Sequence, residues 1–336
     1  MNSKLSAVLD ITRGVKPSHS FDAFAALASD QPLTYEPVDA GEVETAVTHE
    51  SGHAGMVRGG FDLSNQVAVV TGGGRGIGRE IALALAAAGT SVAVTARSAD
   101  QVQTTADMIT VAGGRAMAVP VDVTDETGVQ QAIASIQDSL GAVTLLVNNA
   151  GVGGPIGPTW EVNATEWWRT MEVNLRGVLL WTNAVLPGMV AHRRGRIVNI
   201  ASNAGAYRWP NVSGYSVSKT AVIKFTENLA LELRNKGIAV FAVHPGIVAI
   251  GLTELALNNE SSPDSPAGKV AAWFREEIAA GRDLPPERIT RLVVELASGL
   301  GDVLSGRYID AHDDLTELLA RADQIFEGDL YTLRVR

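Results

Sequence analysis

From Phe61 onward, the sequence alternates between short apolar segments and longer segments with a helical period. The first pair is typical, because "QVAVVTG" has the composition of a buried parallel strand and "IGREIALALAAAG" follows with apolar residues at helical spacing. Strands that alternate with helices in this way form βαβ units around a parallel sheet. The pattern therefore predicts an α/β protein with a doubly wound, seven-stranded parallel sheet and helices on both faces.

Such a sheet is of the Rossmann type, and its elements follow in order along the chain. The predicted strands carry the sequences QVAVVTG, SVAVTA, AMAVPVDV, VTLLVNNAG, GRIVNIAS, GIAVFAVHPG and GRYIDA. The predicted helices cover about residues 77–89, 99–112, 126–140, 164–191, 214–236 and 286–299. We expect three parts: an irregular N-terminal extension (1–60), a Rossmann-fold catalytic domain (61–312) and a tail (313–336) with one amphipathic helix.

Charge and composition narrow the classes of function. The net charge is −10, which argues against binding to the phosphate backbone of nucleic acids. There are no cysteines, so disulfides and thiolate chemistry are excluded. No run of about 18 apolar residues predicts a membrane span. The first twenty residues lack the apolar run of a signal peptide. We therefore expect a cytoplasmic enzyme with a small-molecule substrate and neither membrane nor nucleic acid as a partner.

A glycine-rich segment, "VVTGGGRGIGRE", joins the first strand to the first helix. Gly72, Gly76 and Gly78 have the spacing GxxxGxG. Glycines at this place allow a tight turn and let a pyrophosphate approach the backbone at a helix N-terminus. The alternative is a plain glycine-rich connection, since glycine runs alone are weakly specific.

The end of the second strand bears on the choice of cofactor. A site for NAD commonly has a carboxylate here to hold the ribose 2′-hydroxyl, but this sequence has Ala96 followed by Arg97. Arg75 lies inside the glycine segment. Two guanidiniums that converge on a 2′-phosphate would favour NADP(H), with NAD(H) possible. The alternative is that both are solvated surface arginines.

One motif suggests a metal but lacks the required context. "HESGH", His49 to His53, matches a zinc motif that functions on a helix. Gly52 lies inside it, and no helical period surrounds it. We therefore predict no metal site.

Polar residues recur at the predicted carboxyl ends of the strands and on the neighbouring helices. "NNAG" (Asn148–Gly151) ends the fourth strand, Asn174 lies in the long helix, and Ser202 follows the fifth strand. Tyr215 and Lys219 then come four residues apart on one helix. In this order and spacing, the motifs TGxxxGxG, NNAG and YxxxK resemble the short-chain dehydrogenase/reductase family over about residues 62–312.

The resemblance implies a catalytic set of Asn174, Ser202, Tyr215 and Lys219. Tyr215 would be the acid or base, and a nearby cation can lower the pKa of a tyrosine from about 10 by roughly 1–3 units. Ser202 would bind the substrate oxygen, Lys219 the nicotinamide ribose, and Asn174 a water that links Lys219 to solvent. The cofactor would contact Gly72, Gly74, Arg75, Gly76, Ile77, Gly78, Arg97, Asp122, Val123, Asn149, Ala150, Gly151, Tyr215, Lys219, Pro245, Gly246 and Val248.

Two positions depart from the family pattern. After the sixth strand the family usually has PGxVxT, whereas this sequence reads "PGIVAIGLT", with Ile250 in place of the threonine and Thr253 three residues later. Either the Val248 backbone alone holds the nicotinamide carboxamide, or the loop shifts its register. The family also commonly ends with a glycine pair after the last strand, where this chain reads "YIDAHDD".

The function that we expect is an NADP(H)-dependent oxidoreductase that interconverts a ketone and a secondary alcohol. We expect the substrate pocket to be built from residues 152–160, 203–212 and 249–283. Their aromatic residues Trp160, Tyr207, Trp209 and Trp273 favour a bulky, partly apolar substrate. One alternative keeps the cofactor but performs a net non-redox reaction such as dehydration, isomerisation or cyclisation. Another is a catalytically silent cofactor sensor, which the complete catalytic set disfavours. The resemblance further implies a homodimer or homotetramer that packs through helices 164–191 and 214–236.

Overall fold

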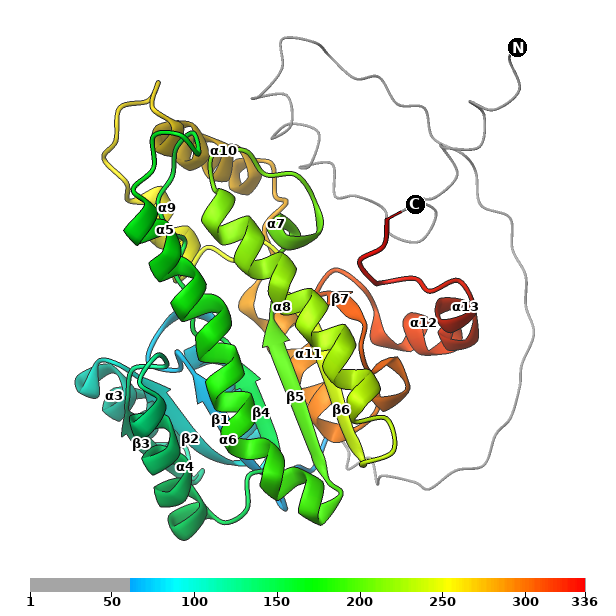
Figure 1. Cartoon of the computed structure of the whole chain (residues 1–336). Helices are drawn as coiled ribbons and strands as arrows, with labels where there is room; N and C mark the ends of the chain where they lie inside the picture. Colours follow the sequence, from blue (N-terminus) through cyan, green and yellow to red (C-terminus); the bar gives the residue numbers. More distant parts are fainter. Residues whose placement is uncertain (1–60, 336) are drawn as a thin grey trace, which may run out of the picture.

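The computed structural model describes residues 61–335, which form one seven-stranded sheet with helices around it (Figure 1). The strands are β1 (Val67–Thr71), β2 (Ser91–Ala96), β3 (Ala116–Pro120), β4 (Leu145–Asn148), β5 (Gly195–Ile200), β6 (Ile238–His244) and β7 (Tyr308–Asp310). All neighbouring strands pair in parallel, in the order β3-β2-β1-β4-β5-β6-β7. The predicted seven-stranded parallel sheet is confirmed.

Helices cover both faces of the sheet. One face packs against α2 (Gly76–Ala87), α3 (Ala99–Val111) and α11 (Pro286–Ser298), and the other against α4 (Glu126–Leu140), α6 (Gly177–His192) and α8 (Ser213–Glu232). The remaining helical segments are α5 (Ala164–Met171), η1 (Glu172–Arg176), α7 (Asn203–Ala206), α9 (Leu252–Leu257), α10 (Pro266–Ala279), η2 (Asp302–Leu304), α12 (Leu315–Ala320) and α13 (Ala322–Glu327).

The apolar strands of the sequence are central because both of their faces are buried. In β1, Ala68 and Val70 join the core cluster under α2 and α11, while Val67 and Val69 join the cluster under α4 and α6. Side chains alternate between the two faces of a strand, so a strand covered on both faces has no polar position. The absence of alternation in "VAVV" thus follows from the layered packing.

The strand order creates the crevice in which ligands of such sheets bind. From β1 the chain runs outward to β3, then returns past β1 to β4 and continues in the opposite direction. The connections after β1 and β4 therefore leave on opposite sides and open a gap at the carboxyl ends of these two strands. The glycine segment and "NNAG" both lie at this point.

Most helix limits match the prediction, because local capping residues fix them. The helix α4 occupies the predicted residues, since the Asp125 side chain caps its start through the Gly128 N–H and Gly141, at φ 104°, ends it. The predicted long helix is continuous but contains the π-helical segment η1. The stretch 250–285, where the sequence shows no clear pattern, contains α9 and α10, and the four-residue α7 was not predicted.

The tail after β7 differs from the single helix that was predicted. It forms two short helices, α12 and α13, that meet at Arg321, and Leu315, Leu318 and Ile325 are buried in the main core. The chain then passes the outer edge of β7, where the Tyr308 N–H donates to the Tyr331 carbonyl at 2.9 Å.

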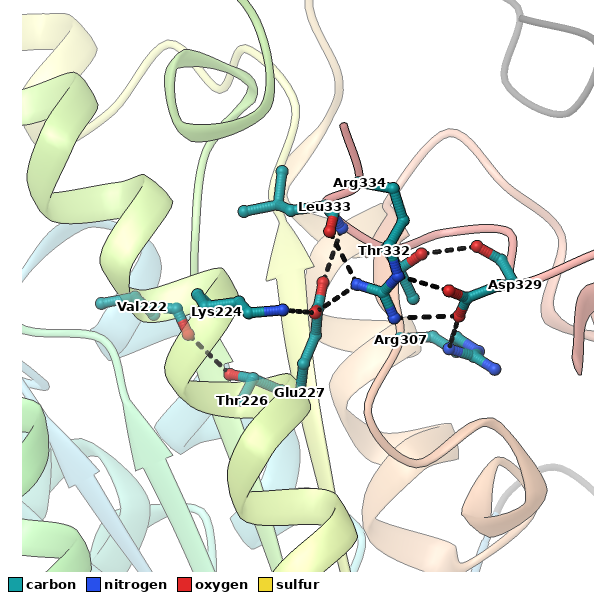
Figure 2. A network of polar contacts seen from close by, with 9 residues as sticks. All are labelled: Val222, Lys224, Thr226, Glu227, Arg307, Asp329, Thr332, Leu333 and Arg334. Atoms are coloured by element: carbon teal, nitrogen blue, oxygen red, sulfur yellow. Dashed lines mark hydrogen bonds and ion pairs between the residues drawn. The ribbon is translucent and has the colours of Figure 1, made fainter. Parts of the chain in front are cut away.

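The last residues of the tail bind the side chain of Glu227 on α8 (Figure 2). Its carboxylate, 6% exposed, accepts from the Leu333 N–H at 2.6 Å and from Arg334 Nη1 at 2.7 Å. It also accepts from Lys224 Nζ at 2.8 Å. Segments more than one hundred residues apart in sequence are thus held together by one buried charge.

Candidate active site

The glycine segment turns sharply between β1 and α2. Gly72 and Gly76 have φ of +65° and +56°, values that favour glycine over any residue with a Cβ. A Cβ on Gly78 would lie 2.4 Å from Asn149 Nδ2, so this helix start packs directly against the end of β4. The segment leaves the N-terminus of α2 facing the crevice, as an anion site requires.

The end of β4 is held in place by hydrogen bonds to β1. The Thr71 hydroxyl accepts from the backbone N–H groups of Asn149 and Ala150, at 3.0 and 3.1 Å. The Asn149 side chain donates to the Thr71 carbonyl at 2.9 Å. The "NNAG" segment is therefore fixed beside the glycine segment before any ligand binds.

Asn174 lies in η1, the π-helical segment between α5 and α6, and is fully buried. Such single π turns inside α-helices often occur at functional sites. Its Oδ1 accepts from the Val152 N–H at 2.8 Å, and its Nδ2 donates to the Val152 carbonyl at 2.9 Å and to Ser218 Oγ at 3.0 Å. The site around Gly151 is narrow, because a Cβ there would lie 3.3 Å from Asn174 Oδ1 and 3.7 Å from Lys219 Nζ.

Tyr215, Lys219 and Ser202 meet at the carboxyl end of β5. The Ser202 hydroxyl hydrogen-bonds the Tyr215 phenol. Lys219 is 4% exposed, and its Nζ donates to the Ile200 carbonyl at 2.7 Å and lies 5.8 Å from the centre of the Tyr215 ring. The structure thus brings together all four residues of the predicted catalytic set, with Asn174 reaching the group through Ser218 and Gly151.

The pKa of Tyr215 moves in the direction opposite to the sequence-based expectation. Burial raises it, and the hydrogen bond from Ser202 acts in the other direction. Burial also lowers the pKa of Lys219 to about 8, since the ammonium form loses its hydration. Burial is thus the larger of the two influences on the Tyr215 phenol.

Ser202, Tyr215 and Lys219 line one cavity of about 810 Å3, whereas the fully buried Asn174 does not line it. Of the predicted cofactor residues, it is lined by Gly72, Gly74, Arg75, Gly76, Ile77, Gly78, Arg97, Asp122, Val123, Asn149, Ala150, Gly151, Tyr215, Lys219, Pro245 and Gly246. Val248 does not line it, because its side chain is buried in the core and its carbonyl accepts from the Ile250 N–H at 2.8 Å. Ile250 itself lines the cavity, as does Thr253 at the start of α9.

One end of the cavity carries the two predicted arginines. Arg75 and Arg97 are exposed, and in residues 61–335 neither forms a salt bridge. Ala96, which ends β2, lines the same end and offers no carboxylate. Asp122 accepts from the Thr124 N–H at 2.9 Å and pairs with Arg169 at 3.3 Å, so both of its oxygens have partners.

The other end of the cavity is apolar and aromatic. Trp209 and Trp273 pack edge to face with ring centres 4.9 Å apart, and Phe274 packs against Trp273. Trp160 is 85% exposed and lies outside the lining, and Tyr207 also falls outside it. The lining residues Ile156 and Phe274 lie in the predicted pocket segments, whereas His312 was not predicted, because no motif marks its position.

The described residues show no metal site and no membrane span. Within residues 61–335, no group of three histidine or acidic side chains is arranged to hold a metal ion. "HESGH" lies outside the described residues, so its prediction stays untested. In the same part of the chain, every helix is too short or too polar to cross a membrane.

Known proteins share this arrangement. The family profile described as short chain dehydrogenase matches residues 66–261. A short chain dehydrogenase of Pseudocercospora fijiensis is 33% identical over 269 residues, which cover 78% of this chain and 85% of the relative. A 3-oxoacyl-[acyl-carrier-protein] reductase of Synechocystis sp. is 40% identical over 220 residues, or 65% of this chain and 87% of the relative. An NAD(P) dependent dehydrogenase from Beutenbergia cavernae, solved with NADP at low occupancy, superposes with a TM-score of 0.66 at 35% identity, over 78% and 100% of the two chains.

Proposed function

The chain belongs to the short-chain dehydrogenase/reductase family of NAD(P)-dependent oxidoreductases, and from this premise we propose its reaction. We propose that it interconverts a ketone and a secondary alcohol with NADP(H), on a bulky and partly apolar substrate. The observation that carries the proposal is the contact of Tyr215 with Ser202 beside the buried Lys219, in the cavity that the glycine segment also lines.

The residues present fit a dinucleotide. The N-terminus of α2 faces the cavity, and the left-handed glycines and the close contact of Gly78 with Asn149 keep side chains out of this wall. Arg75 and Arg97 would bind a 2′-phosphate, while Gly151 and Lys219 would lie against the nicotinamide half. When bound, the cofactor supplies or accepts a hydride.

The protein's own groups handle the proton. A tyrosine holds its proton at neutral pH, so Tyr215 can donate it from Oη to a carbonyl oxygen. In the reverse direction Tyr215 acts as the phenolate, formed by loss of its proton to solvent, and the same oxygen accepts the proton of the alcohol. Ser202 orients the substrate oxygen beside Tyr215, and the Ile200 carbonyl fixes the position of Lys219 Nζ behind it.

The apolar end of the cavity supports the choice of substrate. Trp209, Trp273 and Phe274 present large rings with little hydrogen-bonding capacity, which suits an aromatic or branched organic group. These rings also exclude water from the reacting carbonyl. The Synechocystis relative is named as a reductase of 3-oxoacyl groups, which are ketones, and this agrees with the proposed reaction class.

Substituting Tyr215→Phe tests the proposal. The ring keeps its packing and loses only the hydroxyl, so we expect kcat to fall by roughly 10²–10⁴ while NADPH binding stays nearly unchanged. The measurement is NADPH oxidation with a panel of aryl ketones, and NADPH fluorescence titration is the binding control. Turnover within a few-fold of the parent would refute the role of Tyr215, and product formation without net NADPH consumption would favour the non-redox alternative.

A further inference from the structure

A second cavity, of about 510 Å3, lies away from the candidate active site. Its walls are the C-terminal half of α8, the start of β6, the turn before β7 and the end of the tail, and it shares no lining residue with the active-site cavity. Figure 2 shows the charged side chains in part of its wall. The proposed reaction makes no use of this cavity.

The lining of this second cavity has an excess of positive charge. Its cations are Lys224, Arg234, Arg307 and Arg334, and its carboxylates are Glu227, Asp302 and Asp329. Asp302 is paired on both oxygens, at 2.7 Å each, with Arg196, which is not part of the lining. Four cations therefore face two available carboxylates, an excess of two positive charges on a chain whose net charge is −10.

Arg307 is the most buried of these cations, at 8% exposure, and is poorly neutralised. Its ion pair with Asp329 is long, 3.3 Å, and Asp329 also binds Arg334 through both of its oxygens. Within residues 61–335, Arg307 Nε makes no hydrogen bond. Burial lowers the pKa of Arg307. The carboxylate of Asp329 raises this pKa, and the positive charge of Arg334 lowers it further. A further anion would stabilise the guanidinium.

Arg234 and the apolar lining complete the cavity. The Arg234 side chain is exposed and forms no ion pair in the part of the chain that the structure describes. Leu231, 68% exposed, lies near the end of α8, three residues before Arg234, and Phe326 stacks on Arg307 with 4.4 Å between the guanidinium carbon and the ring centre. The cavity thus offers guanidinium forks beside an apolar surface.

We propose that this cavity binds a phosphate monoester, with Arg234 and Arg307 on the phosphate and Leu231 and Phe326 beside its organic group. A phosphate monoester carries close to two negative charges at neutral pH, which matches the excess in the lining. Its oxygens accept paired hydrogen bonds from guanidinium groups. The site is separate from the proposed chemistry and does not depend on it.

Calorimetric titration of the full chain, saturated with NADPH, tests the site with phenyl phosphate as the probe. NADPH occupies the active-site cavity, where Arg75 and Arg97 would otherwise be open to the phosphate of the probe. We expect millimolar or tighter binding, weakened at least tenfold in Arg234→Gln, an exposed substitution that leaves the fold intact. Arg291→Gln, which removes an exposed arginine of α11, should leave the Kd unchanged.

Several outcomes would overturn the inference. These are no binding in the millimolar range, an equal Kd in Arg234→Gln, or binding lost in Arg75→Ala with Arg97→Ala but kept in Arg234→Gln. Phenol, which lacks the phosphate, should not bind, and equal binding of phenol would show an apolar site instead. Inorganic phosphate should bind more weakly than phenyl phosphate, and equal affinity would exclude a role for Leu231 and Phe326.

Discussion

Glu227 on α8 accepts a hydrogen bond from Nη1 of Arg334 at 2.7 Å, across 107 positions of the sequence. The carboxylate is buried, so its charge depends on the cations that the tail and Lys224 bring to it. The same helix carries Tyr215 and Lys219 in its first turns. The tail therefore stabilises the helix that supplies two of the proposed catalytic residues.

We expect Arg334→Ala to lower the free energy of unfolding by roughly 1.5–3 kcal/mol, the range for hydrogen bonds to charged groups. Lys224 and the Leu333 N–H keep part of the carboxylate paired, so the loss should stay below that of a fully orphaned charge. Urea denaturation measures the effect. The control is Arg291→Ala, which breaks an exposed pair with Glu295 and should cost less than about 1 kcal/mol. Equal losses in the two variants would contradict the role of the tail.

The two arginines at the end of the cavity should set the cofactor preference. Two charge-assisted contacts, each partly exposed, would favour NADPH over NADH by roughly 10²-fold in kcat/KM. Arg75→Ala combined with Arg97→Ala should bring this ratio close to one. Arg115→Ala is the matched control, since Arg115 is exposed and lies outside the cavity. A parent enzyme that prefers NADH, or a double variant with an unchanged ratio, would show that these arginines do not bind the 2′-phosphate.

The lowered pKa of Lys219 predicts the sign of a change in the free energy of unfolding with pH. Its pKa falls from 10.5 to about 8 on folding, so between these pH values the unfolded chain binds more protons than the folded one. The free energy of unfolding from this group therefore rises with pH across that window. Urea denaturation at pH 8 and pH 10 should show a rise in the parent that is smaller in Lys219→Met. The exposed Lys236→Met should behave like the parent, and an equal rise in all three proteins would argue against the shift.

We expect a homodimer or homotetramer built through α5, α6 and α8. Trp168, Leu179 and Val217 on these helices are 60%, 41% and 46% exposed, and they supply apolar surface for a partner chain. Light scattering should give a mass of two or four chains. Combining Trp168→Glu with Leu179→Glu should lower that mass, whereas Leu300→Glu, 45% exposed after α11, should not. A parent with the mass of one chain would contradict this expectation.

The sequence predicts the central strands well because both of their faces are buried. A run such as "VAVV" in β1 has no polar alternation and can only be central, and Asp125 and Gly141 mark the ends of α4. The break in the tail at Arg321 carries no such signal. Leu315 in α12 and Ile325 in α13 are both buried in the core, and the core that they join is formed by the rest of the fold.

For the candidate site too, some features can be predicted from the sequence and others cannot. Glycines that need a left-handed backbone, such as Gly72, and groups at fixed spacing, such as Tyr215 and Lys219, can be found from the sequence. The direction of the Tyr215 pKa shift could not, because it depends on how deeply the surrounding fold buries the phenol. His312 reaches the cavity from a segment without a motif, so only the folded chain brings it there.

The pairing of Glu227 with the tail also sets an order of events during synthesis. Chains emerge from the ribosome at about 5–20 residues per second and begin to fold from the N-terminal side. The 107 residues between Glu227 and Arg334 therefore correspond to roughly 5–20 s in which α8 has been made and its carboxylate lacks the tail. During that interval the Glu227 carboxylate lacks two of the three donors that bind it in the folded chain, the Leu333 N–H and Arg334 Nη1, and only Lys224 is at hand to pair with it.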